Sequence, residues 1–413
     1  SIFLGYERLE AETRIHKLAR RDGRWYVVLV ETPFYAESGG QVGDHGLIRG
    51  KNFELRVVDV QKEGDEIVHI CEGPENLDIS TPEVFAQVDP QWREPTMRNH
   101  TATHLLHAAL RRVLGEHVRQ AGSLVAPDRL RFDFTHFKKI DRQELEEIEW
   151  LVNEKIQQDL PVEVIHTDYQ KAVQMGAMAL FGEKYGDRVR VISIDGFSKE
   201  LCGGTHVRHT GQIGPFVIVQ ETSVASGIRR VEALTGPRAV QFIQQSRDVV
   251  QDLDQLLNCS WEQLPAKVNS LVEQLRQTER ALQRLKARQL LEQVDELLKQ
   301  GKKINGITLV MAEFEDVEID LLKQLGDRLR QQAQSTVGLF VNRWPDRANL
   351  VCAVTDDLIE QKGLKAGQLV KEAARVAGGG GGGRPHLATA GIKQVDKIPQ
   401  IRKYLEETLQ KFA

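Results

Sequence analysis

Two short motifs, about a hundred residues apart, each carry two side chains that bind metal ions well. The first is His100-Thr-Ala-Thr-His104 and the second is Cys202-Gly-Gly-Thr-His206. Three imidazoles and one thiolate form a ligand set that zinc favours. A fold that uses all four must bring the two distant segments together, and this requirement constrains the chain more than any other feature.

The spacing within each motif is compatible with binding of a single ion. Residues four apart on a helix share one face, so a helical first motif can direct both imidazoles at one point. The two glycines of the second motif free the backbone to bring its thiolate and imidazole to the same point. We therefore predict one Zn²⁺ per chain, bound by the His/Cys cluster, which is defined as His100, His104, Cys202 and His206. The alternative is a buried cysteine among ordinary core histidines.

The role of this zinc stays open at the sequence level. Four protein ligands are typical of a closed structural site, whereas catalytic zinc usually keeps an open position. The small polar neighbours Thr103 and Thr205 favour an active site instead. His107 follows His104 by three residues, and it could support the ligands or lie on the helix surface; the sequence favours the surface.

Composition excludes several classes of protein. A chain of 413 residues predicts two to four domains. A net charge of −4 excludes a globally basic nucleic-acid coat but leaves room for local basic faces. No apolar run approaches the roughly 20 residues that span a membrane, and no signal peptide precedes the first strand. Four widely separated cysteines favour a reducing, cytoplasmic location.

The first half of the chain changes from mostly β to mixed structure. Strand formers dominate 25–30 and 53–60, and the glycine-containing segment 32–44 between them reads as a turn loop. A helix is predicted from Asn99 or Thr101 to Leu114, where Gly115 ends it. Further strands are predicted at 131–134, 189–194, 214–219 and 227–236, and a helix at 141–158 that Asp141 caps together with Glu144.

The second half begins with helix formers over 237–303, interrupted near Asn258 and Pro265. Apolar residues at heptad spacing suggest either a helical hairpin or arm, which we favour, or a dimerising coiled coil. Buried-type strands follow at 307–310, 337–341 and 350–354, and a closing helix at 398–412. The six glycines at 378–383 lack the Lys-Ser/Thr ending of a phosphate-binding P-loop, so a flexible loop is the simple alternative to phosphate contact there.

Several motifs together resemble the editing part of the alanyl-tRNA synthetase family. They are the loop 34–44, the His motif within 98–107, Gln120-Ala-Gly-Ser123, Leu130-Arg-Phe-Asp-Phe134 and Leu201–Val207. The glycine run with Arg384-Pro385 resembles the C-terminal domain of the same family. Free-standing editing relatives share many of them, and threonyl-tRNA synthetases carry a similar pair of metal motifs without the glycine-rich domain. The resemblance implies an α+β multidomain chain. Its parts would be a β-barrel-like subdomain (1–92), a zinc editing domain (93–236), a helical, coiled-coil-like arm (237–303) and an α/β DHHA1-like domain (304–413).

The resemblance also implies a function. The chain would hydrolyse alanine tRNA that carries serine or glycine, with Thr103 bound to the serine hydroxyl and Gln120 orienting water or the ester carbonyl. The C-terminal domain would contact tRNA and could form a homodimer. The aminoacylation domain would precede Ser1, so this chain should neither activate alanine nor bind ATP. Candidate substrate and RNA contacts are Gly39, Gly40, Gln41, Arg98, Arg131, Arg229, Arg230 and Arg384.

Three alternatives remain beside this reading. The chain could be a free-standing trans-editing protein, a zinc-stabilised RNA-binding module without catalysis, or an interaction fragment that drives oligomerisation. Taken singly, the arginines at 98, 131, 229 and 230 are each better explained as ordinary surface or ion-pair residues.

Overall fold

The computed structural model describes residues 1–77, 79–179 and 186–412. The chain separates into two compact units, Ser1–Leu256 and Leu257–Ala413, and both contain helices and sheets. The predicted α+β multidomain class is therefore confirmed, while the four-part division of the chain stays a prediction. None of the helices in the described ranges has the length and apolarity needed to cross a bilayer.

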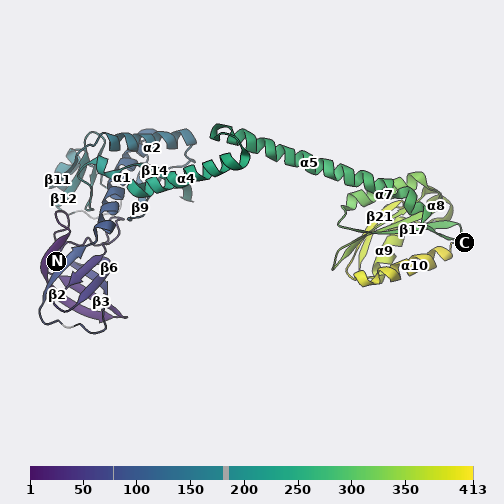
Figure 1. The fold of residues 1–413 in the computed structure, drawn as a ribbon, viewed down its shortest axis with the longest axis horizontal. Coiled ribbons are helices and arrows are strands. Elements are labelled where there is room, and N and C mark those ends of the chain that lie inside the picture. Colours follow the sequence, from purple (N-terminus) through teal and green to yellow (C-terminus); the bar gives the residue numbers. More distant parts are fainter. Residues whose placement is uncertain (78, 180–185, 413) are drawn as a thin grey trace. The chain divides into compact units, whose positions relative to one another are not determined.

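The first unit begins with a closed six-stranded barrel (Figure 1). Alternating side chains point inward, as expected for half-buried strands, and Val27, Leu29, Ile48 and Leu55 are among those that fill the interior. A separate parallel pair joins β1 (Ile2–Phe3) to β4 (Glu31–Thr32). The barrel strands in pairing order are β2 (Glu10–Arg21), β3 (Arg24–Leu29), β7 (Glu66–Glu72), β6 (Glu54–Glu63), β5 (Gly46–Arg49) and β8 (Glu83–Val88).

A neutral histidine inside the barrel predicts that the first unit loses stability in acid. His69 is buried between the Val27 carbonyl and the Thr32 hydroxyl, and burial lowers its pKa to about 4. An unfolded histidine titrates near 6.5, so the unfolded state takes up the proton first as the pH falls. The stability is fully present above about pH 6.5 and is lost toward pH 4, with a loss of about 2–3 kcal/mol by pH 4.5. Urea unfolding at pH 7.5 and 4.5 measures this; a His69→Gln variant with the same pH dependence would contradict it.

Helix α1 (Pro90–Leu114) leads out of the barrel and carries the first metal motif. It begins well before the predicted start at Asn99 or Thr101, so that prediction was wrong. The Asp89 carboxylate accepts a hydrogen bond from the Gln91 amide, and Pro90 occupies the first helical position, where no amide donor is needed. Pro95 removes one backbone hydrogen bond without ending the helix.

Two sheets and three further α-helices complete the described part of the first unit. Helices α1 and α2 (Arg142–Gln157) pack on an antiparallel sheet through Leu105, Phe132 and Ile148. The predicted Asp141–Glu144 capping box is present. Residues 169–174 form the short helix α3, and α4 (Gly236–Leu257) ends the unit. The sheets are β14 (Phe216–Ala225), β15 (Ile228–Thr235), β10 (Leu130–Thr135) and β9 (Gln120–Val125), and β11 (Val162–Asp168), β12 (Arg188–Ile194) and β13 (Ser198–Leu201).

The second unit is a six-stranded sheet with helices on both faces (Figure 1). The predicted break before the long helix is confirmed at Asn258, which has φ +49°. One face of the sheet is covered by helices α8 (Asp356–Lys362), α9 (Ala366–Val376) and α10 (Ile398–Gln410). The other face is covered by α7 (Ile319–Gln332), α6 (Val294–Lys299) and the end of α5 (Leu264–Glu292). The strand order is β16 (Lys302–Ile304), β17 (Ile307–Glu315), β18 (Thr336–Arg343), β19 (Ala348–Val354), β21 (Leu387–Ile392) and β20 (Gly380–Gly383).

The glycine run ends in an edge strand, so the flexible loop that the sequence left open as an alternative is not what forms. Strand β20 pairs antiparallel with β21, and helix α9 packs against it. A Cβ atom on Gly381 would lie 2.2 Å from the Thr389 carbonyl oxygen, and one on Gly367 of α9 would lie 2.7 Å from the Gly383 carbonyl oxygen. Glycine is therefore required by close backbone contact on the strand and on the facing helix.

Candidate metal centre

The fold brings the two distant motifs together in the first unit. His100 and His104 lie one turn apart on α1, as predicted, while Cys202 and His206 follow directly after β13. One potential ligand atom from each of the four lies within 4.8 Å of the other three, and all four residues are buried. The Cys202 Sγ atom is 3.4 Å from Nε2 of both His100 and His206.

Each histidine of the cluster is oriented through its other ring nitrogen. A protein oxygen lies within hydrogen-bond distance of every Nδ1, and none of these oxygens belongs to the cluster itself. With the proton on Nδ1, each Nε2 lone pair is free for the centre, the arrangement that metal-binding histidines usually show. The oxygens are Gln41 Oε1 at 2.7 Å from His100, Glu200 Oε2 at 2.6 Å from His104 and Thr101 Oγ1 at 3.2 Å from His206.

The donor set fits a zinc ion. Nε2 of His104 is buried, and within the described ranges it has no hydrogen-bond partner. An unpaired buried nitrogen is costly unless something binds it. Together with two further imidazole nitrogens and a sulfur, it forms the mixed nitrogen and sulfur set that zinc prefers over magnesium or calcium.

Electrostatics favour the thiolate form of Cys202. Burial raises the pKa of this thiol. The surrounding imidazoles, His100 first, lower the pKa by more than burial raises it, so the net pKa lies well below its usual value. Burial lowers the pKa of His104, and the Glu200 carboxylate with Cys202 more than offsets this and raises it to about 10. Burial and the neighbouring His100 lower the pKa of His206 to about 3. The thiolate is the form in which cysteine binds zinc.

Glu200 links the cluster to a histidine that the sequence placed on the surface. His107 is buried, and its Nδ1 lies 2.8 Å from Glu200 Oε1. The other carboxylate oxygen, Oε2, lies within hydrogen-bond distance of His104 Nδ1. The surface interpretation of His107 was therefore wrong. Sequence reasoning also missed Glu200 itself, although a metal-binding histidine needs an acceptor for its second nitrogen and an acid two residues before Cys202 was available.

The glycine loop of the barrel reaches the cluster through Gln41, which the sequence proposed as a substrate contact. Gln41 is fully buried; its Oε1 accepts from the Thr205 amide at 2.9 Å and lies 2.7 Å from His100 Nδ1. The Gly40 carbonyl oxygen accepts from the Val125 amide at 2.7 Å, which ties the loop to β9. Gly39 lines the cavity above the cluster.

Gly204 is required where the second motif crosses the first. A Cβ atom there would lie 2.1 Å from Cε1 of His100 and 2.8 Å from Oε1 of Gln41. No larger residue fits without displacing His100 or Gln41.

The two proposed catalytic residues lie on different elements. Thr103 is buried on α1 beside His104, and its hydroxyl donates to the Asn99 carbonyl at 2.8 Å. Gln120 is the first residue of β9, opposite Phe134 of β10, and is partly exposed. Their roles stay predictions.

Most of the candidate arginines have acidic partners. Arg230 donates to both oxygens of Asp133, at 2.7 and 2.8 Å, and Arg229 pairs with Glu221. These contacts orient each guanidinium and partly neutralise it. Two longer ion pairs join Arg131 to Asp133 at 3.8 Å and Arg98 to Glu94 at 3.4 Å. Arg384 of the second unit is exposed and has no ion pair within the described ranges.

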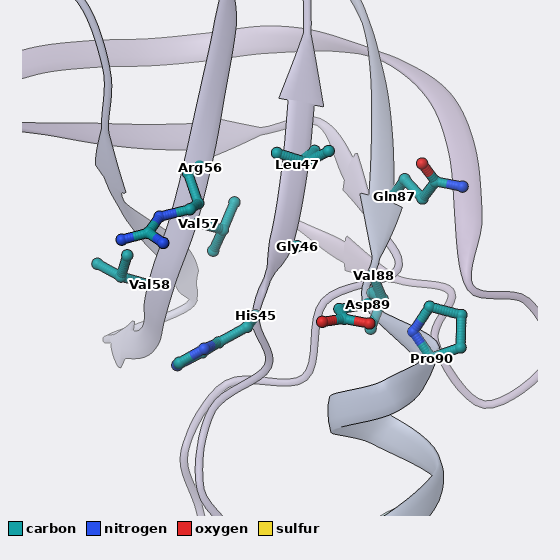
Figure 2. Close-up of a pocket in the computed structure, with 10 residues that line it drawn as sticks. All are labelled: His45, Gly46, Leu47, Arg56, Val57, Val58, Gln87, Val88, Asp89 and Pro90. Carbon is teal, nitrogen blue, oxygen red and sulfur yellow. The ribbon is translucent and has the colours of Figure 1, made fainter.

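A cavity of about 440 Å³ at the barrel rim is a weaker candidate (Figure 2). His45 stacks on Trp92 with ring centroids 3.5 Å apart, and the Asp89 carboxylate caps helix α1. Arg56 is paired with Glu72 at 2.6 Å. The polar groups of this cavity thus already have structural partners. A cavity of about 410 Å³ is lined directly by His100 and Cys202 and is the better candidate.

Comparison with known families agrees with this arrangement. Residues 189–232, which include Cys202 and His206, match the threonyl and alanyl tRNA synthetase second additional domain. Residues 3–92 match the class II (A) tRNA synthetases, and residues 306–411 match the DHHA1 domain.

Two curated relatives and one solved structure are similar to parts of this sequence. The chain is 43% identical to an alanine–tRNA ligase of Oceanobacillus iheyensis, over 99% of this chain and 48% of the relative. It is 40% identical to that of Thermoanaerobacter sp. strain X514, over 96% of this chain and 46% of the relative. The chain thus spans about half the length of these curated relatives. A solved C-Ala domain from Aquifex aeolicus alanyl-tRNA synthetase is 34% identical, with 27% of this chain and 97% of that domain covered and a TM-score of 0.26.

Proposed function

The chain belongs to the alanyl-tRNA synthetase family, and on that premise we propose that its first unit is a zinc-dependent editing hydrolase. It would cleave the ester between alanine tRNA and a wrongly attached serine or glycine. The observation that carries this proposal is the buried His/Cys cluster, with its ring nitrogens oriented, at the wall of a cavity that can admit a substrate.

The chemistry of alanine selection creates the need for such a site. A pocket that accepts alanine cannot strongly reject serine, which differs by one hydroxyl, or the smaller glycine. A second site that hydrolyses the wrong ester restores accuracy, provided that it spares alanine.

The residues divide this work between binding and positioning. His100, His104, Cys202 and His206 would hold the zinc, which when bound supplies a positive charge that polarises the ester or a water molecule. Thr103, next to His104, would bind the serine hydroxyl once its hydroxyl turns from the Asn99 carbonyl. Gln120 would orient the ester carbonyl or the attacking water.

The second unit would contact tRNA away from the ester. A groove between α9 and the glycine strand β20 is lined by Lys365, Lys371 and Arg375, and Arg384 lies next to Gly383. The three cations that line the groove outnumber its one carboxylate, Glu372, and together with the bare backbone they suit a phosphate backbone. A homodimer through this unit and a cytoplasmic location belong to the same proposal.

Hydrolysis of seryl-tRNA tests the function directly. We expect the purified chain to deacylate seryl-tRNA for alanine at least about 100-fold faster than alanyl-tRNA, a ratio within reach of hydrogen bonding to the serine hydroxyl. Prolonged treatment with a zinc chelator should remove the activity, and added zinc should restore it. The reason is that hydrolysis would depend on the zinc ion that the His/Cys cluster holds. The rate of ester loss from radiolabelled tRNA measures this.

A zinc-stabilised RNA module without catalysis is the second candidate. The four-ligand count favours it, because closed sites are usually structural. A chain that holds one equivalent of zinc and binds tRNA, yet leaves seryl-tRNA intact, would decide for the module.

A further inference from the structure

A cationic cavity lies against the His/Cys cluster in the first unit. It measures about 410 Å³, and His100 and Cys202 form part of its wall. Lys62 of the barrel, Arg188 and Arg190 of β12 also line it, and none of its described lining residues is an aspartate or glutamate. Within the described ranges, Lys62 and Arg188 form no ion pair, so their charges face the cavity unneutralised.

Arg190 joins this cavity to the loop of the second motif, Cys202 to His206, which we call the metal loop. Its Nη1 donates to the carbonyl oxygens of Cys202 and Gly204 at 2.9 and 2.8 Å, and its guanidinium lies 4.2 Å from the ring centroid of Tyr6. The Tyr6 hydroxyl donates to the Gly203 carbonyl at 2.5 Å. Nε of Arg190 is buried, and in the described part of the chain it has no hydrogen-bond partner. A buried guanidinium donor without an acceptor favours an anionic ligand.

We infer that this cavity binds the last phosphodiester of an RNA 3′ end, through Lys62, Arg188 and Arg190. The inference rests on the proposed function. In an aminoacylated RNA, that phosphate lies one ribose away from the ester. The three cations line the same cavity as His100 and Cys202, so a phosphate bound by the cations would place the ester near the cluster. The volume falls in the range of pockets that enclose one small ligand, which suits a single terminal nucleotide. Phosphate contacts of this kind position a nucleic acid without reading its sequence.

Lys62 and Arg188 are the residues to change, because both are exposed and, within the described ranges, neither side chain is hydrogen-bonded to the His/Cys cluster. Arg190 holds the metal loop, so its loss would confuse binding with metal retention. The matched control is Arg24→Ala with Lys139→Ala, which removes two exposed cations elsewhere in the same unit. The probe is a fluorescein-labelled acceptor-stem microhelix that ends in a non-hydrolysable 3′-seryl amide.

Fluorescence anisotropy should show that Lys62→Ala with Arg188→Ala weakens probe binding about 10-fold or more, with zinc content unchanged. The salt dependence of log Kd should become shallower by about 0.7, the value for one phosphate contact on a single strand. In hydrolysis, KM should rise while kcat changes little. The control should bind as the parent chain does.

The outcomes separate this inference from the proposed function. A parent chain that binds the probe but leaves seryl-tRNA intact overturns the editing proposal, and a selective binding loss in the double variant would still support the phosphate site. A double variant that binds as tightly as the control overturns the phosphate site, even if the parent chain hydrolyses seryl-tRNA. A parent chain that does not bind the probe overturns the site as well.

Discussion

Alanine at both Cys202 and His104 is expected to lower seryl-tRNA deacylation by more than about 100-fold and zinc content below half an equivalent. Loss of a group that only supports a metal ligand already costs about 10–100-fold in affinity or activity, so loss of two ligands should cost more. In the parent chain, four ligand atoms lie within 4.8 Å of one another. The double variant keeps only two of them, and two protein ligands cannot close a tetrahedral site. Elemental analysis and the deacylation rate, measured on the same preparation, give the two readings.

Two further variants sharpen this experiment. Glu200→Gln keeps one carbonyl oxygen but cannot accept from both His104 and His107, so zinc affinity should fall about 10–100-fold and added zinc should restore activity. Added zinc should not rescue the double alanine variant. Cys259→Ala, at a half-buried free cysteine of the second unit, is the matched control and should match the parent chain. Unchanged hydrolysis in the double variant would exclude the zinc mechanism.

Local sequence patterns predicted the cluster because the physics that builds it is local. The i, i+4 spacing of His100 and His104 needs only a helix, and the glycines before His206 need only a flexible turn. The Asp141–Glu144 capping box was found for the same reason. Each of these features depends on residues within one or two turns of the backbone.

Features that depend on distant residues could not be found in this way. Gln41 contacts His100 across 59 residues, and Glu200 contacts His107 across 93, so neither pairing leaves a local pattern. His107 seemed to lie on the surface because its burial depends on where β13 packs. No strand was predicted in the glycine run because glycines without side chains carry no alternating pattern; pairing with β21 decides its structure.

A buried ion pair connects the barrel to helix α1, and its disruption should strongly destabilise the first unit. Asp44 follows the glycine loop, and Arg93 lies on α1; both side chains are only 1% exposed. Arg93 also donates to the carbonyl oxygens of Gly5 and Pro33, at 2.6 and 2.9 Å. Asp44→Ala would leave this guanidinium charged and buried without a counterion, which costs about 3–5 kcal/mol. Urea unfolding of the full chain, followed by tryptophan fluorescence and compared with the parent chain, measures the loss.

The exposed pair on the same helix provides the control. Glu94 and Arg98 lie 3.4 Å apart near the surface, so Glu94→Ala should cost less than about 1 kcal/mol. Equal destabilisation by the two variants would contradict the role given to Asp44. Because the loop from Tyr35 to Asp44 also carries Gln41, the Asp44 variant should lose zinc at urea concentrations below its main unfolding transition. Loss of zinc only together with global unfolding would instead mean that the loop holds His100 independently of this ion pair.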